Sequence, residues 1–327
     1  MFLLNSIFFT IIFIIITHNL FFKLGIKNYF KKSNNSQRWG KYDAYLIGGF
    51  IFISFFIYLY ILDYFKITNF FLNVYELFIL LIFFSVGFYD DKFNLSGKIK
   101  LILYFLVIVG LTIYYLDDLN YLHIFLIGLI LFFVFVALNI IDNMDGNFSL
   151  FFLIFTSYFI IINFSYFDLS VSSLIGILLV NIYFLFINIF KGKNYLGDSG
   201  SYLLSGFIII IFLKYRNSID INQTIYLDSI ILLNLFAYPI YDLIYVSVKR
   251  VLNGKSPLAG GTDHTSHVFS KLFDSDFKSL NVIGFANIIY YSISLYINVF
   301  EINLLLNFLL IIIFYIFLSI LTFYQNK

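Results

Sequence analysis

Eleven long apolar runs restrict this chain more than any other feature of its sequence. A helix needs about 20 apolar residues to cross the roughly 30 Å of hydrocarbon in a bilayer. The runs cover residues 2–22, 44–62, 70–89, 99–116, 121–139, 148–165, 169–190, 201–214, 229–248, 280–299 and 303–323. We therefore predict an all-α integral membrane protein with about eleven transmembrane helices, built as a single polytopic domain over residues 1–327.

The composition agrees with this class. Hydrophobic residues make up 61% of the chain and charged residues only 12%, whereas a soluble domain is about 45–50% apolar and about 25% charged. The absence of cysteine excludes disulfides, thiolate catalysis and cysteine-based zinc sites. A net charge of +2 gives no argument for a nucleic-acid partner, and we expect none. The first run lacks a basic segment before it and a small-residue cleavage site, so we expect a retained span rather than a signal peptide.

The basic residues predict the orientation. Seventeen of the twenty Lys and Arg residues follow odd-numbered spans, and three, Lys66, Lys214 and Arg216, follow even-numbered ones. Because cytoplasmic connections carry the excess of Lys and Arg, we predict an N-terminus outside, a cytoplasmic C-terminus and a location in the cytoplasmic (inner) membrane.

Four polar segments interrupt the apolar pattern, near 90–100, 139–147, 191–201 and 249–279. Each one follows an odd-numbered span, which places all four on the predicted cytoplasmic face. Taken singly, each resembles an ordinary polar end of a helix, but unrelated helix ends would scatter over both faces. We therefore predict one composite site that faces the cytosol.

The segment 139–147 carries carboxylates in a pattern that suits a cation. On a helix Asn139, Asp142 and Asp145 recur at i, i+3 and i+6, close to one face. Carboxylates that face the same way repel one another unless a positive charge lies between them, and Mg²⁺ prefers oxygen ligands. The alternative is a solvated loop that ends a span.

The segments around Asp90-Asp91 and Asp198 suit the handling of phosphate. Adjacent carboxylates can hold Mg²⁺ or accept a proton, and Lys98, one to two turns later, offers a point charge to a phosphate oxygen. Asp198 lies between Gly197 and Ser199 and is our first choice for a direct metal ligand. The alternatives are interfacial charge at Asp90-Asp91 and a turn that caps the next helix at Asp198.

The last polar segment carries two histidines. His264 and His267 lie at i and i+3 and can share a helical face. A zinc site would need acids to complete it, and donors to a diphosphate fit better beside so many carboxylates. Lys249 and Arg250 we assign mainly to anchoring the ninth span.

With these residues in view, the chain resembles the polyprenyl-phosphate N-acetylhexosamine-1-phosphate transferase family, of the glycosyltransferase family 4 type, in its undecaprenyl-phosphate GlcNAc-1-phosphate transferase branch. The resemblance covers nearly the whole chain. It rests on an ordered set of motifs: Asp90-Asp91-Lys92, the Asn-x-x-Asp-x-x-Asp-Gly segment 139–146, Gly-Asp-Ser-Gly-Ser at 197–201, Pro-Ile-Tyr-Asp at 239–242, and Asp-His-x-Ser-His at 263–267.

The resemblance implies transfer of a sugar-1-phosphate from a UDP-N-acetylhexosamine, with UDP-GlcNAc as the default, to undecaprenyl phosphate, with release of UMP and a need for Mg²⁺ or Mn²⁺. Such a reaction initiates lipid-linked surface-glycan synthesis, as in cell-wall or lipopolysaccharide biogenesis. By similarity, Asp90 and Asp91 assist the attacking lipid phosphate, and Asp91 lies near the metal that Asp198 binds. Further residues that the resemblance implies in catalysis or substrate binding are Lys98, Asn139, Asp142, Asp145, His264 and His267.

The chain departs from the family pattern at several positions. Asn143 stands where relatives usually have Gly, Asn147 where they have an apolar residue, and Ser266 where they have one His of His-x-His-His. These positions bear on contacts to uracil or sugar. The usual Pro-Thr-Pro-Arg before Gly48-Gly49 is missing, with Arg38 and Lys41 as candidate replacements. Because the carboxylates are intact, we expect an active enzyme.

Two alternatives stay open. One is the phospho-MurNAc-pentapeptide transferase of peptidoglycan synthesis, whose usual Phe-His-His motif does not match residues 263–267. The other is a membrane transporter or lipid-binding protein without catalysis, which would not need four polar segments on one face. The sequence leaves open the sugar, the downstream glycan, the oligomeric state (a homodimer included), and whether the mechanism is one-step or covalent.

Overall fold

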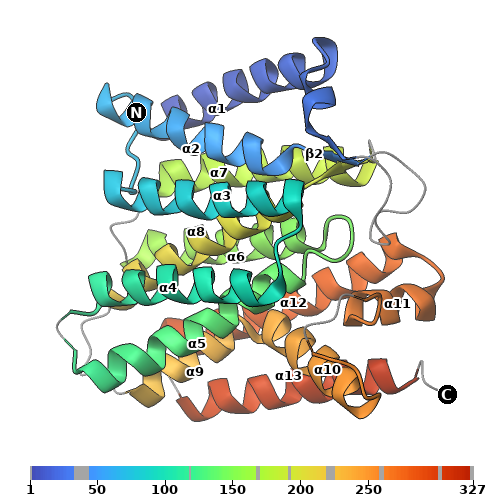
Figure 1. Ribbon diagram of the computed structural model, residues 1–327. Coiled ribbons are helices and arrows are strands. Elements are labelled where there is room, and N and C mark those ends of the chain that lie inside the picture. The colour runs from blue at the N-terminus through green and yellow to red at the C-terminus, as the bar shows by residue number, and fades with distance from the viewer. Residues whose placement is uncertain are drawn as a thin grey trace. The chain divides into compact units, whose positions relative to one another are not determined.

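The computed structural model describes residues 2–32, 44–117, 119–166, 170–190, 193–218, 225–257, 261–300 and 304–324. These residues are mostly helical (Figure 1), as predicted. The helices are α1 (Phe2–His18), α2 (Gly48–Tyr64), α3 (Val74–Phe93), α4 (Gly97–Tyr115), α5 (Tyr121–Ile140), α6 (Asn147–Tyr166), α7 (Val171–Phe190), α8 (Gly197–Ser218), α9 (Ile225–Leu235), α10 (Ala237–Leu252), α11 (Thr265–Phe273), α12 (Asp276–Phe300) and α13 (Leu304–Tyr324), with the π-helix η1 (Asn19–Lys23) and the 3₁₀-helix η2 (Ile26–Phe30).

All eleven predicted apolar runs lie largely within helices. Among the described residues, seven helices are long and apolar enough to cross a membrane, or up to eight if the bent pair α9–α10 is one span. Two further apolar helices, Gly48–Tyr64 and Asn147–Ile162, are shorter. These helices support a multi-pass membrane protein. The count of eleven spans and the orientation of the termini stay predictions.

The chain divides into two compact units. The first contains residues 1–95 and 155–208, and the second contains residues 96–154 and 209–327. The predicted single domain stays a prediction.

In the first unit, α1 packs along α7, and α2 packs against α3 and α7 (Figure 1). Aromatic side chains fill the space between these helices. The ring of Phe13 lies 4.9 Å from that of Phe55, and the ring of Phe56 stacks at 4.8 Å on that of Phe207, which lies on α8. Phe55, Phe56 and Phe207 are completely buried, so they form the core of this unit.

A small sheet in the first unit was not predicted from the sequence. Strand β1 (Lys31–Lys32) pairs antiparallel with β2 (Ala44–Leu46), which pairs parallel with β3 (Asn194–Tyr195). The last two strands lead directly into α2 and α8. The sheet therefore brings the first residues of α2 beside the first residues of α8, where Asp198 lies.

Helix α3 starts at a capping box. The Asn73 side chain accepts a hydrogen bond from the Glu76 N–H at 2.9 Å, and the Glu76 carboxylate accepts one from the Asn73 N–H at 2.8 Å. Such reciprocal bonds satisfy two otherwise unpaired donors. They determine where this 20-residue helix begins, and its last turn then carries Asp90 and Asp91.

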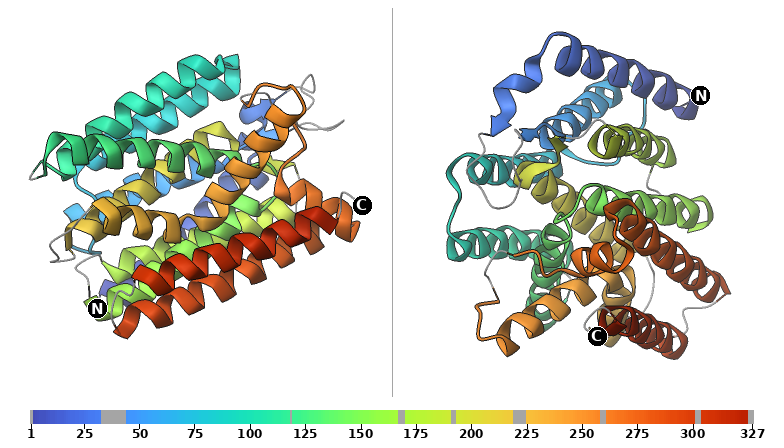
Figure 2. Two further views of the ribbon diagram at one scale, coloured as in Figure 1. Left: turned by 90° about the horizontal axis from the view of Figure 1, so that it is seen from below. Right: turned by 90° about the vertical axis from the view of Figure 1, so that its right-hand side faces the viewer.

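In the second unit, α4 and α5 form a hairpin, and α5 also packs against α9 and α10 (Figure 2). Helix α13 contacts α9 and α12, and the short α11 lies on α12.

The chain bends by 85° between α9 and α10. The hydroxyl of Tyr291 on α12 donates to the carbonyl of Leu235 at the end of α9. The Asn234 amide donates to Asn307 at 2.5 Å and accepts from Tyr290 at 2.9 Å. Buried backbone groups need such partners, so these bonds stabilise the bend. The bend determines where α10 begins and places Asp242 in its second turn.

Candidate functional site

In the first unit, Asp91 binds the N-terminus of α8. Its Oδ1 accepts the Asp198 N–H at 2.9 Å, and its Oδ2 accepts the Ser199 N–H at 3.0 Å. The first N–H groups of a helix have no partner within the helix and carry partial positive charge, so a carboxylate is stabilised there. The contact joins two motifs that are 107 residues apart in the sequence.

Glycines allow this close approach. A Cβ atom on Gly87 would lie 2.6 Å from the Ser199 Cα, and one on Gly49 would lie 2.6 Å from the Ser199 Oγ. Real Cβ contacts are longer, so larger residues at these positions would push α2 and α3 away from α8. Gly87 lies one turn before Asp91 and lets α3 come near enough for the Asp91 carboxylate to reach α8.

Asp90 is almost fully buried. It accepts hydrogen bonds from the Tyr202 hydroxyl at 2.6 Å and from the Leu95 N–H at 2.8 Å. Tyr202 lies one turn after Asp198 on α8, so both acids of the Asp-Asp pair bind α8. We call Asp90, Asp91 and Asp198 the carboxylate cluster. The sequence predicted its three acids, while Gly87 and Tyr202 were missed because neither residue type marks a site by itself.

The carboxylate cluster concentrates negative charge. Burial raises the pKa of the Asp91 carboxyl to about 7, the charge of Asp198 adds to the rise, and the backbone N–H groups oppose it. Two hard oxygen donors that repel one another suit a divalent cation, and Mg²⁺ binds through one or two carboxylates together with substrate phosphates. Among the described residues, no group of three or more His, Cys, Asp or Glu side chains could hold a metal. The zinc alternative at the histidines therefore gains no support, and the Mg²⁺ or Mn²⁺ site stays a prediction.

In the second unit, the predicted helical face with Asn139, Asp142 and Asp145 is wrong. Helix α5 ends at Ile140, and residues 141–146 form a turn before α6, with Gly146 in the left-handed region at φ 81°. The Asn143 side-chain amide donates to the Ile140 carbonyl at 3.0 Å and so ends α5. Asn139 therefore lies in the last turn of α5, whereas Asp142 and Asp145 lie in the turn.

Asp145 lies exposed on this turn. Partial loss of water around its carboxyl, followed by the negative charge of Asp276, raises its pKa to about 6. Lys98 is exposed in the first turn of α4. Arg38 and Lys41 lie outside the described residues.

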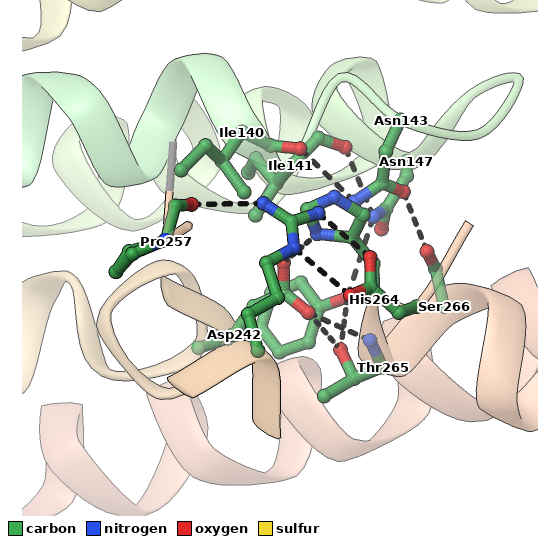
Figure 3. A network of polar contacts seen from close by, with 12 residues as sticks. Ile140, Ile141, Asn143, Asn147, Asp242, Pro257, His264, Thr265 and Ser266 are labelled. Atoms are coloured by element: carbon green, nitrogen blue, oxygen red, sulfur yellow. Dashed lines mark hydrogen bonds and ion pairs between the residues drawn. The ribbon is translucent and has the colours of Figure 1, made fainter. Parts of the chain in front are cut away.

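Asp242 organises the histidine-bearing segment (Figure 3). It is completely buried, and its Oδ2 lies 2.9 Å from the His264 Nδ1. Its Oδ1 accepts from the Thr265 N–H at 2.8 Å and from the Thr265 hydroxyl at 2.6 Å. A carboxylate accepts hydrogen bonds, so Nδ1 of His264 carries the proton in this contact, and Nε2 is left for a ligand.

Behind Thr265, a chain of bonds reaches the turn after α5. The Tyr238 hydroxyl lies 3.4 Å from the Thr265 hydroxyl, and the Asn147 amide donates to Tyr238 at 3.3 Å and to the Ile141 carbonyl at 3.0 Å. Figure 3 shows Asn147, Ile141 and Thr265 within this network. Asn147, predicted as a departure from the family pattern, is thus a buried link between two polar segments.

Arg250 corrects a second prediction. It was assigned to anchoring a span, but it is only 5% exposed and forms a two-pronged ion pair with Asp263, at 2.6 and 2.9 Å. A third nitrogen donates to the Pro257 carbonyl at 3.0 Å. Bonding to Arg250 holds the pKa of Asp263 below its usual value. Its partner lies thirteen residues away, so the pair closes the loop that leads to His264.

His267 lies beside His264, with ring centres 5.7 Å apart. His264 precedes α11 as its N-terminal cap in an extended conformation, and His267 lies within the helix. The two rings lie close together, but they do not share the helical face that the spacing predicted. Burial lowers the pKa of His267, and His264 adds to this effect, while the charges of Asp242, Asp276 and Asp263 oppose it. Its Nδ1 is buried and has no hydrogen-bond partner.

The structure brings the polar segments together in two pairs. The 87–91 and 197–202 segments meet in the first unit, and the 139–147 and 261–267 segments meet in the second. The single composite site made of all four stays a prediction.

The matches to known proteins agree with the motifs. Residues 73–216 match glycosyl transferase family 4, which confirms the resemblance over a segment that contains Asp90, Asp91, Asn139, Asp142, Asp145 and Asp198. The chain is 28% identical over 192 residues to the undecaprenyl-phosphate alpha-N-acetylglucosaminyl 1-phosphate transferase of Thermotoga maritima. This similarity covers 58% of each protein, so the chain spans little more than half of that relative.

Proposed function

We propose that this protein transfers an N-acetylhexosamine-1-phosphate from a UDP-sugar to undecaprenyl phosphate and releases UMP. UDP-GlcNAc is the first candidate donor, because the Thermotoga maritima relative is named for N-acetylglucosaminyl 1-phosphate transfer. The match of residues 73–216 to glycosyl transferase family 4 supports the reaction class. The apolar helices support a substrate that is anchored in a membrane.

The observation that carries the proposal is the contact of Asp91 with the start of α8. It holds two carboxylates, Asp91 and Asp198, next to each other at the end of the apolar run 70–89. A lipid phosphate enters a site from the membrane and a nucleotide-sugar enters from water, so a site at the edge of a membrane serves both.

Asp198 and Asp91 would hold Mg²⁺ or Mn²⁺, which neutralises diphosphate charge when it is bound. In the reaction, an oxygen of the lipid phosphate attacks the phosphorus that bears the sugar. A new P–O bond forms, the bond from that phosphorus to the bridging oxygen breaks, and UMP leaves with the bridging oxygen. Such transfers depend on positioning and charge neutralisation more than on covalent chemistry by the protein.

The other residues take binding roles in this proposal. Asp90 and Asp91 orient the attacking phosphate and Lys98 neutralises part of its charge. Asn139, Asp142 and Asp145 would bind the nucleotide-sugar, and His264 and His267 would contact its diphosphate through the ring nitrogens that face away from Asp242. Asp242 supports His264 because it holds the Nδ1 side of the ring.

The test is release of UMP by purified protein given undecaprenyl phosphate, Mg²⁺ and a panel of UDP-sugars. We expect lipid- and metal-dependent UMP with UDP-N-acetylhexosamine, and the panel names the sugar. Release only with UDP-MurNAc-pentapeptide would assign the protein to peptidoglycan synthesis. If folded protein releases no UMP with any sugar of the panel, a transferase function is refuted and a transporter or lipid-binding protein is favoured.

We further propose that the site faces the cytosol of the cytoplasmic membrane. The chain has no cysteine, so single cysteines report on sidedness without background. Tyr121 and Asp145 lie exposed near opposite ends of α5. We expect Asp145→Cys to be labelled from the cytosol and Tyr121→Cys from outside, and the reverse pattern would refute the orientation.

A further inference from the structure

The start of α11 is held by bonds to several elements of the second unit. The two residues before Ser266 bond Asp242 on α10. The Ser266 hydroxyl donates to the Asn143 Oδ1 in the turn after α5, at 2.5 Å. The Ser279 hydroxyl on α12 donates to the Ser266 carbonyl at 2.9 Å. Ser266 therefore ties α11 directly to the turn with Asp142 and Asp145.

The orientation of the Asn143 amide follows from its two partners. Its nitrogen donates to the Ile140 carbonyl at 3.0 Å, which leaves the oxygen to accept from Ser266. Ser266 is completely buried, and a buried hydroxyl without a partner is costly. Figure 3 shows Asn143 and Ser266 facing each other across this contact. The Ser266 hydroxyl is the donor, the Asn143 side-chain oxygen is the acceptor, and the two side chains together span the distance between α11 and the turn.

Asn143 and Ser266 are also two of the positions where the sequence departs from the pattern that it resembles. The pattern has no side chain at one position and an imidazole at the other. Here a medium-sized amide meets a short hydroxyl.

The next residue along the chain is His267, whose Nδ1 is buried without a partner. Its ring lies 5.7 Å from that of His264. Ser266 lies between the two histidines, so a shift of Ser266 moves both imidazoles relative to Asp142 and Asp145.

We propose that Asn143 and Ser266 form a positioning pair that sets the distance between the Asp142–Asp145 turn and His264 and His267, and thereby the affinity for the nucleoside diphosphate part of the donor. This inference rests on the proposed function for the identity of the ligand. Neither residue touches the reacting atoms.

Ser266→Ala and Asn143→Gly each remove the hydrogen bond between these two residues, and Asn143→Gly also removes the bond to the Ile140 carbonyl. We expect each to raise KM for the UDP-sugar about 5- to 10-fold, since one hydrogen bond contributes that much. We expect kcat and KM for undecaprenyl phosphate to stay within about twofold, because the lipid phosphate does not depend on this contact. An equal change in both KM values, or no change in either, would overturn the proposal.

Two control variants match the chemistry. The Asn253 amide donates to the Lys249 carbonyl at the end of α10, at 2.8 Å, and is exposed. Asn253→Gly therefore removes a helix-ending asparagine of the same kind. Ser54 bonds the carbonyls of its own helix α2. We expect Asn253→Gly and Ser54→Ala to leave both KM values unchanged.

The double variant Asn143→Gly/Ser266→His tests the pairing directly. We compare its kcat/KM with the value expected if the losses of Asn143→Gly alone and Ser266→His alone multiplied. We expect the double variant to exceed that value at least about fivefold, because contacting residues are coupled. Strictly multiplicative effects would refute the pair.

Binding of UDP to the purified protein, measured by calorimetry, separates this inference from the proposed function. If the wild type releases no UMP, the proposed function fails, but weaker UDP binding in Ser266→Ala would still support the positioning pair. UDP binding that is equal in wild type and Ser266→Ala, or absent from both, would overturn it.

Discussion

Asp91 in the first unit and Asp263 in the second hold their negative charges in opposite ways. Asp91 accepts two backbone N–H groups beside a second carboxylate, and its pKa rises to about 7. Asp263 accepts hydrogen bonds from two N–H groups of Arg250, and these bonds lower the pKa of its carboxyl. The charge of Asp263 is neutralised within the protein, so this acid belongs to the scaffold of the histidine-bearing loop. The carboxylate cluster is instead suited to receive positive charge from outside the chain.

The largest effect should come from the carboxylate cluster. We expect Asp198→Asn to lower UMP release by about 1,000-fold or more, because it removes a charge that a transferred phosphoryl group depends on. The variant should remain folded in detergent, as judged by its thermal transition. Asp117→Asn, an exposed acid in the loop before α5, serves as the control and should stay active. Near-wild-type turnover in Asp198→Asn would remove Asp198 from the metal role.

In the second unit, we expect loss of the Asp263 carboxylate to act mainly on the stability of the protein. We expect Asp263→Asn to lower the free energy of unfolding by about 2–3 kcal/mol, since it leaves the buried Arg250 without its carboxylate. The double variant Arg250→Met/Asp263→Leu should recover much of this loss, because both charges are then absent. Thermal unfolding in detergent measures both. A double variant as unstable as the single one would show that the ion pair is not the cause.

The close contact between α3 and α8 should be disturbed by a single methyl group added at Gly87. We expect Gly87→Ala to cost about 1–3 kcal/mol, because overpacking of a close contact forces backbone shifts. UMP release should fall together with stability, since Asp91 would then lie farther from the N–H groups of Asp198 and Ser199. Gly110→Ala is the control, because a Cβ atom there meets no heavy atom within 4 Å. A fully stable and active Gly87→Ala would contradict the tight contact.

The pH dependence of stability should reveal the lowered pKa of Asp263. In the unfolded chain this carboxyl titrates near its usual value of 3.8, and in the folded protein it titrates lower. Its contribution is therefore fully present above the unfolded pKa and is lost as the pH falls through the folded pKa, by about 1.4 kcal/mol for each unit of difference. The stability difference between wild type and Asp263→Asn should be constant from pH 8 to pH 5 and shrink below pH 4. A constant difference down to pH 2 would contradict the shift.

The smallest effect should come from Asp145. Its pKa is raised from 3.8 to about 6, so this carboxyl destabilises the folded protein increasingly as the pH rises from 3.8 to about 6, and by a constant amount above that. Asp145→Asn should therefore raise stability slightly at pH 8, by less than about 1 kcal/mol because solvent screens an exposed group. The gain should vanish below pH 4, where the carboxyl is protonated in both states. A gain that is largest at low pH would reverse the sign and refute the shift.

The sequence by itself determined the helices and the segments that carry the chemistry. Apolar runs of about 20 residues predict helices because each one satisfies its own backbone hydrogen bonds in a nonpolar surrounding. The acids at 90–91, 142–145 and 198 were visible as charges at the ends of these runs.

Only the tertiary structure decided which partner each polar group finds. The contact of Asp91 with α8 spans 107 residues and needs the close approach at Gly87. The reassignment of Arg250 from a span anchor to an ion pair, the placement of Asp142 and Asp145 in a turn, and the contact between Asn143 and Ser266 likewise depend on packing. A hydrogen bond depends on a distance of about 3 Å and on direction, and spacing along the chain does not set either one between residues on different helices.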